Sequence, residues 1–260
     1  MEDLVRELGE ARRLVVLTGA GMGLASGIPT FRGTDPGAVW AHDVMEMGTF
    51  RFFKQDPVES WRWYRSRFSK LEGARPNAGH RALVEIEAWA VEGGRDFLLV
   101  TQNIDTLHRK AGSERLVEVH GRADRVRCPR VGCRLGAPTG SIDRAEVDFG
   151  PFDAAPSRES LPRCPDCGAA VRAHVLWFDE FYDEHQDYQF RRAMAALAAA
   201  DLVCFVGTSF SVGVTEAALR TRARKWTIDA TAEGVPRGVA LVTGAQVEVL
   251  PRLVAALRSR

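Results

Sequence analysis

Short apolar runs alternate with helix-like segments along most of this chain. The runs occupy residues 14–17, 97–100, 202–206 and 239–242. The segments with apolar residues at helical spacing are 2–12, 80–91, 187–199, 214–224 and 249–258. Strands that alternate with helices predict a parallel sheet with helices on both faces. We therefore expect an α/β fold built on a doubly wound, Rossmann-like parallel sheet.

The composition is that of an ordinary globular protein and narrows the range of partners. Of the 260 residues, 45% are hydrophobic and 27% are charged, and the net charge is +1. Because no basic stripe is present, nucleic acid is not an expected partner. No apolar run approaches the ~18 residues that a membrane span needs, and the N-terminus lacks the apolar core of a secretory signal. We therefore expect a cytoplasmic protein that does not bind membranes.

A glycine-rich turn follows the first predicted strand. Glycines at this place let backbone N–H groups approach a pyrophosphate at the start of a helix. Leu24 stands where a strict dinucleotide-binding fingerprint has its third glycine, and such a turn can also simply join a strand to a helix. Phe31 and Arg32, as an apolar lid and a phosphate partner, favour a nucleotide site. The candidate cofactor residues of the turn itself are Gly19, Ala20, Gly21, Met22 and Gly23.

Four of the five cysteines form two closely spaced pairs. Four residues separate Cys128 from Cys133, and two separate Cys164 from Cys167. Two thiolate pairs on tight turns can close a tetrahedral Zn²⁺ site, and four protein ligands leave no open position, so the expected role is structural. Two disulfides or free thiols are the alternative. Cys204 lies inside a predicted strand and is expected to be a buried thiol.

Two regions interrupt the α/β alternation and divide the chain into domains. Residues 31–75 are aromatic and charged, whereas residues 123–173 are rich in proline, glycine, arginine and cysteine. A module that cannot build its own core commonly uses a structural metal. We expect a Rossmann-like domain that binds the cofactor, a helical module with the cofactor loop, and a smaller inserted zinc-ribbon module. Their ranges are 1–30, 76–122 and 174–260 for the first, 31–75 for the second and 123–173 for the third.

Polar side chains gather after the second predicted strand. Ligands of doubly wound sheets bind at the carboxyl ends of strands, and Gln102, Asn103, Asp105 and His120 are all predicted to lie there. His120 is the candidate general base because an imidazole titrates near neutrality. A capping or structural histidine is the alternative. Asn103 and Asp105 also have a simpler interpretation, since they can cap a helix over residues 105–111.

Together these motifs resemble one family, the sirtuins, which are NAD-dependent protein-lysine deacylases. The similarity covers nearly the whole chain, through GAGMGLASGIPTFRG, TQNIDTLHRKAG, EVHG, HVLWFDE, VGTS, VLPRL and the four paired cysteines. The resemblance implies that an acyl-lysine amide oxygen attacks C1′ of the nicotinamide ribose and that nicotinamide leaves. A histidine then acts as base on the ribose hydroxyls, and His120 matches it. The products would be free lysine, nicotinamide and O-acyl-ADP-ribose.

The resemblance also implies how the chain holds NAD⁺ as a co-substrate. Ile104 and Asp105 would hold the carboxamide, and Gln102 and Asn103 the ribose, with Asn103 counted among the catalytic residues. The other contacts to NAD⁺ would come from the lid and from residues around its phosphates and adenosine. These are Phe31, Arg32, Trp40, Gly207, Thr208, Ser209, Asp229 and Gln246.

The partner that the resemblance implies is a protein with an acylated lysine, bound as an extended peptide. Val175, Leu176 and Phe178 would line the acyl-lysine tunnel and pair with the peptide as an added strand. The zinc ion would be structural, and we expect the chain to be monomeric.

The acyl group is suggested by Tyr64 and Arg67, which resemble the Tyr-x-x-Arg pair of sirtuins that handle acidic acyl groups. A guanidinium can grip a terminal carboxylate with two hydrogen bonds while a phenol adds a third. The sequence therefore predicts that succinyl or malonyl groups are preferred and that acetyl is accepted. The alternative is a packed helical face of aromatic residues beside solvated arginines. The aromatic residues would be Trp61, Trp63, Tyr64 and Phe68, and the arginines would be Arg65 and Arg67.

Three positions depart from the family pattern. Gly23 replaces a serine, so a hydroxyl near the pyrophosphate is lost. Asp179 replaces a glycine and is expected to add negative charge at the mouth of the peptide groove. Asp229 replaces an asparagine near the adenosine ribose, where a carboxylate can still accept hydrogen bonds.

Other activities fit the same resemblance. A protein mono-ADP-ribosyltransferase or an NAD glycohydrolase would use a protein nucleophile or water in place of the acyl-lysine. An NAD-sensing zinc protein would bind partners without turnover. His120 and the tunnel residues favour the deacylase.

Overall fold

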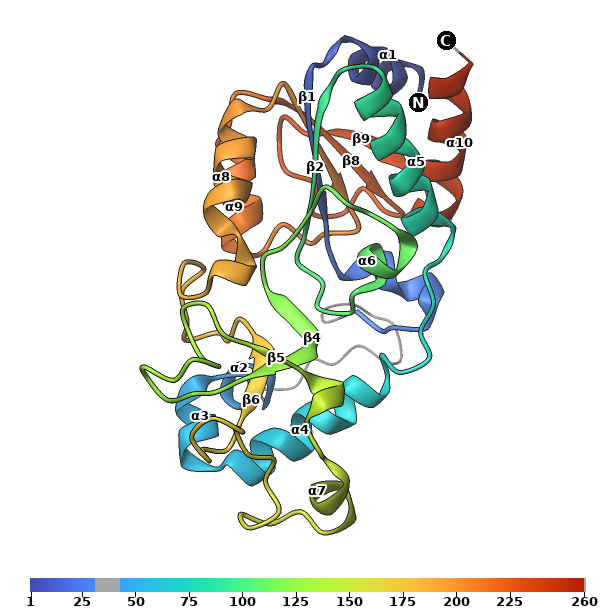
Figure 1. Cartoon of the computed structure of the whole chain (residues 1–260). Helices are drawn as coiled ribbons and strands as arrows, with labels where there is room; N and C mark the ends of the chain where they lie inside the picture. Colours follow the sequence, from blue (N-terminus) through green and yellow to red (C-terminus); the bar gives the residue numbers. More distant parts are fainter. Residues whose placement is uncertain (31–42, 260) are drawn as a thin grey trace.

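A six-stranded parallel sheet forms the centre of the computed structural model, which describes residues 1–30 and 43–259. Its strands are β1 (Arg13–Thr18), β2 (Asp96–Thr101), β3 (Leu116–Glu118), β7 (Leu202–Val206), β8 (Arg224–Asp229) and β9 (Ala240–Thr243). They lie in the order β3-β2-β1-β7-β8-β9, and each neighbouring pair is parallel. The order extends from β1 toward β3 and from β7 toward β9, so the winding reverses between β1 and β7 (Figure 1).

Helices cover both faces of this sheet. One face carries α1 (Glu2–Glu10), α5 (Ala78–Glu92) and α10 (Gln246–Arg258), and the other carries α8 (Phe190–Ala199) and α9 (Gly213–Leu219) (Figure 1). The side chains of β1 alternate between two cores, as a strand requires. Leu14 and Val16 join the core under α1, α5 and α10, while Val15 and Leu17 join the core under α8 and α9. The predicted doubly wound α/β fold is confirmed.

The apolar pattern predicts most of the elements of this domain. The four predicted runs are all strands, but β3 and β8 are not among them, because β3 has only three residues and the Arg-Lys-Trp-Thr-Ile-Asp of β8 contains no continuous apolar run. The helix predicted over 214–224 is wrong at its end. The structure ends α9 at Leu219, and the chain enters β8 at Arg224.

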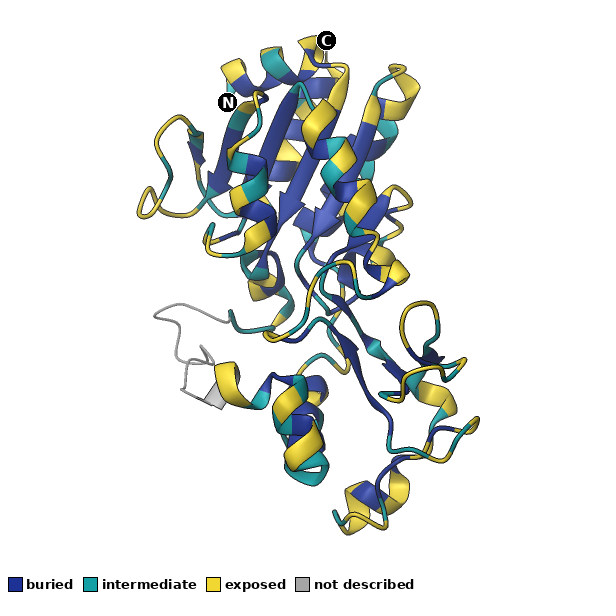
Figure 2. Cartoon of the chain, turned by 90° about the vertical axis from the view of Figure 1, so that its left-hand side faces the viewer, coloured by how far each residue is buried: buried dark blue, intermediate teal, exposed yellow. Residues whose placement is uncertain are grey.

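A smaller antiparallel sheet lies beyond the carboxyl ends of the parallel strands (Figures 1 and 2). It has the order β5-β4-β6, with β4 (Gly121–Arg127), β5 (Ile142–Asp143) and β6 (Arg172–Val175). The helices beside it are α2 (Asp43–Met47), α3 (Phe50–Gln55), α4 (Pro57–Ser69), α7 (Gly150–Ala154) and the 3₁₀ turn η2 (Arg144–Glu146). Across the described residues, every helix is too short or too polar to cross a membrane.

The two segments that interrupt the α/β alternation share one hydrophobic core. Trp61 and Phe68 of α4 pack in the same cluster as Val126 and Phe152 from the cysteine-rich segment. The Trp61 indole N–H also donates to the carbonyl of Val171 at 2.7 Å. The cysteine-rich segment, which has too few apolar residues to build a core alone, therefore obtains much of its core from α3 and α4.

Candidate active site

Two glycine-containing segments meet where β1 and β7 end. The Gly21 N–H donates to the carbonyl of Gly207 at 2.9 Å, and the Gly19 N–H donates to Val206 at 3.1 Å. A Cβ added at Gly19 or Gly21 would lie 2.8 Å from backbone atoms of Gly207, and Gly207 itself has a φ of +58°. This contact fixes the glycine turn, η1 (Ala20–Ser26), at the point where the sheet reverses, which is where such sheets bind ligands.

Two amide side chains donate hydrogen bonds to backbone carbonyls of the turn. Gln246 donates its amide to the carbonyl of Gly21, and Asn77, the N-cap of α5, donates to the carbonyl of Met22 at 2.8 Å. Met22 is fully buried in the core, so only its backbone can face a ligand. Sequence reasoning missed Asn77 as a support of the turn. The available signal was an N-cap residue just before a predicted helix.

Gln102 and Asn103 lie at the end of β2 and reach across to the glycine turn. The Gln102 amide donates to the Thr18 carbonyl and to the Thr208 hydroxyl, both at 3.2 Å. The Asn103 amide donates to the Gly19 carbonyl at 2.9 Å. Asn103 therefore joins β2 to the turn rather than capping the following helix.

Asp105 does cap that helix, as the simpler interpretation expected. Its carboxylate accepts from the Leu107 N–H at 2.8 Å, at the start of α6 (Leu107–Ala111). The side chain is also buried, and this desolvation raises the pKa of Asp105 to about 6. Ile104, the preceding residue, is partly buried against the core of the smaller sheet. Its carbonyl accepts a hydrogen bond from the Ala123 N–H at 2.9 Å.

His120 follows β3 and carries two hydrogen bonds with different partners. Its Nδ1 lies 2.8 Å from the Gln102 carbonyl, and its Nε2 lies 3.1 Å from the Tyr182 hydroxyl. Burial lowers the pKa of His120 to about 4 against the opposing effect of the Gln102 carbonyl, so the imidazole is neutral near pH 7. No motif in the sequence marked Tyr182, which lies in the loop after β6.

The residues that the sequence predicts for the adenosine side lie at or just after the ends of β7 and β8. Thr208 is buried, and the Ser209 hydroxyl lies 2.8 Å from that of Ser211. Asp229 accepts from the Thr231 N–H at 3.1 Å. The remaining predicted cofactor contacts, Phe31, Arg32 and Trp40, lie outside the described residues.

Tyr64 and Arg67 are both part of the aromatic cluster on α4. Tyr64 is buried, with its ring 6.0 Å from that of Trp177 and nearly parallel to it. The Arg67 guanidinium lies 3.7 Å from the centre of the Trp63 ring. The packed aromatic face that we considered as an alternative is therefore present, but Arg67 stacks on it rather than extending into solvent.

The three predicted tunnel residues form a short extended segment next to His120. Val175 is buried and pairs with Gly121, and the Leu176 N–H donates to the His120 carbonyl at 2.9 Å. The Phe178 N–H donates to Gly48 at 3.0 Å, and its side chain is exposed. The segment thus connects the base to the helical module.

The departures from the family pattern have local structural reasons. A Cβ at Gly23 would lie 3.1 Å from the Cβ of Ile28, so a serine there would require Ile28 to shift. Asp179 accepts from the backbone N–H groups of Phe50 and Arg51 at 2.7 and 3.0 Å. The carboxylate therefore caps the start of α3. The sequence predicts only that Asp179 adds negative charge at the mouth of the peptide groove, and does not predict this capping role.

The four paired cysteines come together in one cluster, as predicted. Their sulfurs all lie within 4.8 Å of one another, with Cys128 and Cys167 at 3.4 Å and Cys133 and Cys164 at 3.7 Å. In a tetrahedron with Zn–S bonds of about 2.3 Å, neighbouring sulfurs are about 3.8 Å apart. The donor set fits a closed structural zinc site and argues against two disulfides. Cys204 is buried in β7, as expected.

A second group of side chains has the chemistry to hold a metal, but hydrogen bonds account for most of its contacts. His174, His185 and Asp187 place their polar atoms within 4.8 Å of one another. His185 uses both ring nitrogens, one with the Gly140 carbonyl at 3.1 Å and one with the Asp187 N–H at 3.2 Å. Asp187 also accepts from Ser141 at 3.0 Å. These bonds tie the turn η3 (Gln186–Tyr188) to the inserted segment.

The fold and site define a doubly wound α/β protein with an inserted cysteine-cluster module, and comparisons place it in a family. The model described as "Sir2 family" matches residues 19–214. The chain is 41% identical over 213 residues to the NAD-dependent protein deacylase of Thermus thermophilus, covering 82% of this chain and 75% of that protein. It is 35% identical over 259 residues to NAD-dependent protein deacylase 2 of Pyrobaculum aerophilum, covering 97% and 94%.

Solved structures agree with this assignment. A Sir2 homolog in complex with NAD matches with a TM-score of 0.79 at 32% identity, covering 100% of this chain and 94% of that one. A Sir2 structure with a p53 peptide and NAD⁺ matches with a TM-score of 0.79 at 26% identity. This chain belongs to the Sir2 family.

The cysteine cluster predicts one tightly held zinc ion per chain. Replacing Cys167 by Ala should abolish zinc retention and lower the thermal midpoint by roughly 5–10 °C, because a structural metal contributes directly to folding. Cys204→Ala is the control, since it removes a thiol that lies in β7, outside the cluster, and should keep the zinc. Elemental analysis and thermal unfolding measure both effects. Full stability of Cys167→Ala without metal would contradict the structural role.

The buried carboxyl of Asp105 predicts a pH-dependent stability. Its pKa rises from an ordinary 3.8 to about 6 on folding, so the folded chain binds more protons between these values and stability falls as the pH rises through them. Asp105→Asn removes this loss while keeping an oxygen for Leu107. At about pH 8 the variant should be more stable by about 2–3 kcal/mol, and the gain should vanish near pH 4. Urea unfolding tests this, and an equal gain at both pH values would contradict it.

Proposed function

We propose that this chain is an NAD-dependent protein-lysine deacylase that uses His120 as its base. The observation that supports this most directly is the bond between His120 Nδ1 and the Gln102 carbonyl at 2.8 Å. A carbonyl can only accept, so Nδ1 carries the proton and Nε2 is the basic atom. The names of the relatives from Thermus thermophilus and Pyrobaculum aerophilum point to the same activity.

Proton transfer at His120 depends on its surroundings. The low pKa of the buried imidazole keeps Nε2 free of a proton at neutral pH. When Nε2 accepts a proton from a substrate hydroxyl, the Gln102 carbonyl stabilises the imidazolium that forms. The same carbonyl holds the ring orientation before and after the transfer.

The glycine contact and the two amides of β2 would position NAD⁺. NAD⁺ supplies the ribose carbon that the acyl oxygen attacks and the nicotinamide that leaves. Gly19 and Gly21 leave a backbone surface without side chains at the reversal of the sheet, which suits a pyrophosphate. Asn103 and Gln102 are already fixed by hydrogen bonds to the turn, so little ordering is needed when the ribose binds.

The acyl group that the site favours is succinyl or malonyl, with acetyl accepted. A guanidinium is planar and can bind a carboxylate with two hydrogen bonds, and stacking on an aromatic ring restricts its orientation. Arg67 is stacked in this way on Trp63. Burial raises the pKa of Tyr64, so its phenol keeps the proton that it would donate.

Three further properties of the chain stay predictions: that it is cytoplasmic, that it is a monomer, and that it does not bind nucleic acid.

Replacing His120 by Ala tests the activity. Loss of the base should lower deacylation of an acyl-lysine peptide by about 10²–10⁴-fold. NAD⁺ affinity, measured by calorimetry, should change far less because the glycine turn and Asn103 are intact. Unchanged turnover in the variant would contradict the role of His120, and equal loss of NAD⁺ binding would make it a structural residue.

Replacing Arg67 by Met tests the acyl preference. Methionine keeps the packing on Trp63 but removes the charge, so kcat/KM for a succinyl-lysine peptide should fall about 10–100-fold. The value for the acetyl-lysine form of the same peptide should change little. Arg62→Gln is the matched control, because Arg62 is an exposed arginine on the same helix that forms an ion pair with Glu59 at 3.5 Å. Equal losses on both peptides would contradict the acidic-acyl preference.

A further inference from the structure

The basic nitrogen of His120 is already occupied in this structure. Its Nδ1 must carry the proton that the Gln102 carbonyl accepts, so Nε2 has a lone pair and no proton. The Tyr182 hydroxyl lies 3.1 Å from Nε2 and is therefore the donor of that bond. Nε2 has only one lone pair, which a substrate hydroxyl must also use if it is to give its proton to His120.

Packing holds Tyr182 in this position. Its ring stacks on Phe190 of α8, with centroids 4.5 Å apart and planes inclined by 18°. The phenol also feels the backbone of Val214 at the start of α9, which lowers the pKa of Tyr182 against the effect of burial. The ring is thus fixed against α8 while its hydroxyl reaches His120.

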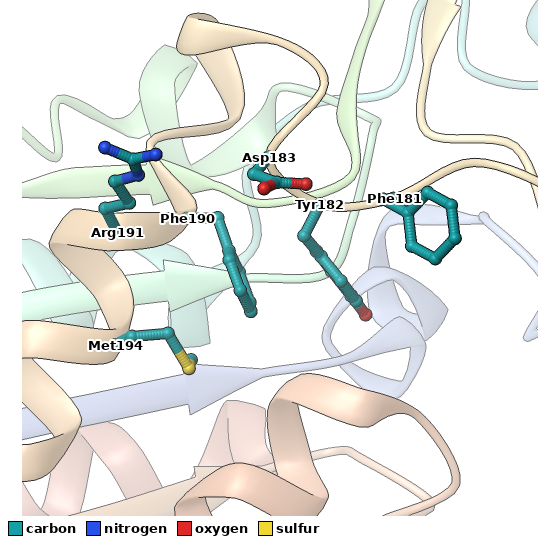
Figure 3. Close-up of a pocket in the computed structure, with 6 residues that line it drawn as sticks. All are labelled: Phe181, Tyr182, Asp183, Phe190, Arg191 and Met194. Carbon is teal, nitrogen blue, oxygen red and sulfur yellow. The ribbon is translucent and has the colours of Figure 1, made fainter.

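Space for another position of this ring lies next to it. A hollow of about 450 Å³ adjoins Tyr182 and Phe190, lined by Phe181, Tyr182, Asp183, Phe190, Arg191 and Met194 (Figure 3). Figure 3 shows the Tyr182 ring beside that of Phe190, with its hydroxyl pointing away from Asp183 and Arg191.

We propose that Tyr182 is a positioning residue whose hydroxyl donates to the basic nitrogen of His120, and that a ribose hydroxyl of the bound nucleotide replaces it there. The proposal rests on the proposed function, because it assumes that His120 accepts a proton from a ribose hydroxyl. While the nucleotide is absent, the phenol keeps the imidazole in the tautomer that can accept a proton. When the ribose hydroxyl binds, it replaces the phenol as the donor to Nε2, and the phenol keeps its contact with Val214 or moves into the hollow.

The test compares ADP-ribose binding in matched variants of the full chain. ADP-ribose carries the ribose hydroxyls without a reactive nicotinamide, so its affinity reports the exchange of donors alone. Tyr182→Phe keeps the stack on Phe190 and removes the competing hydroxyl. Tyr188→Phe is the control, because it removes a hydroxyl from the same loop but Tyr188 packs against His174 and His185 rather than His120. Each substitution is measured by calorimetry in the wild-type and His120→Ala backgrounds.

The expected result is specific to one variant and one background. Tyr182→Phe should bind ADP-ribose about two- to tenfold more tightly, the range that one neutral hydrogen bond supports, while Tyr188→Phe should not. The gain should disappear in His120→Ala. In turnover, KM for NAD⁺ should fall by a similar factor and kcat should not fall.

Three results would overturn the proposal. Weaker or unchanged binding of ADP-ribose by Tyr182→Phe, or a lower kcat, would mean that the phenol does not compete with the ribose hydroxyl for His120. Tighter binding that persists in His120→Ala would mean that Tyr182 acts elsewhere. If neither wild type nor any variant bound ADP-ribose, the proposed function itself would fail, and that failure is distinct from the first two.

Discussion

The close contact between the backbones of Gly21 and Gly207 is the constraint on which the site depends. It brings the ends of β1 and β7 together without side chains between them, and a Cβ at either glycine would prevent this approach. The neighbouring hydrogen bonds extend from there to the base: Asn103 holds the Gly19 carbonyl, and the Gln102 N–H donates to Thr18. The Gln102 carbonyl then fixes the imidazole of His120. The orientation of His120, the proposed base, is thus set by the same sheet reversal that forms the proposed nucleotide surface.

The smaller lobe carries the residues proposed for the substrate side and is assembled from two distant segments. The cysteine-rich segment has too few apolar residues to form a core alone, but α4 and this segment together bury Trp61, Phe68 and Phe152. The cysteine cluster lies within this arrangement and closes the turns that carry its thiols. The lobe is joined to the base directly, since the Leu176 N–H donates to the His120 carbonyl. Loss of the metal or of the aromatic packing is therefore expected to disturb the geometry beside His120 as well as the stability of the lobe.

Local patterns in the sequence predict those features that are decided locally. The apolar runs of β1, β2 and β7 and the spacing of the four cysteines are of this kind, and the structure has all of them. β8 is missed because its apolar residues, Trp226 and Ile228, are separated by a threonine, whereas the prediction relied on continuous apolar runs. Tyr182 and Asn77 are missed for another reason: their roles arise from contacts with residues more than fifty positions away, such as His120 and Met22. Asp179 shows the converse, because its charge is evident in the sequence but the backbone N–H groups of α3 that donate to its carboxylate reach it only in the fold.

The account rests on acyl transfer from lysine to the ribose of NAD⁺ at the carboxyl edge of the sheet. The most direct measurement is quantitative mass spectrometry of one reaction that contains the chain, NAD⁺ and a peptide with a single acylated lysine. The account predicts that free lysine, nicotinamide and O-acyl-ADP-ribose appear in equal amounts throughout the reaction. Nicotinamide release without deacylated peptide, or with ADP-ribose attached to protein, would contradict it and would favour NAD hydrolysis or ADP-ribosyl transfer.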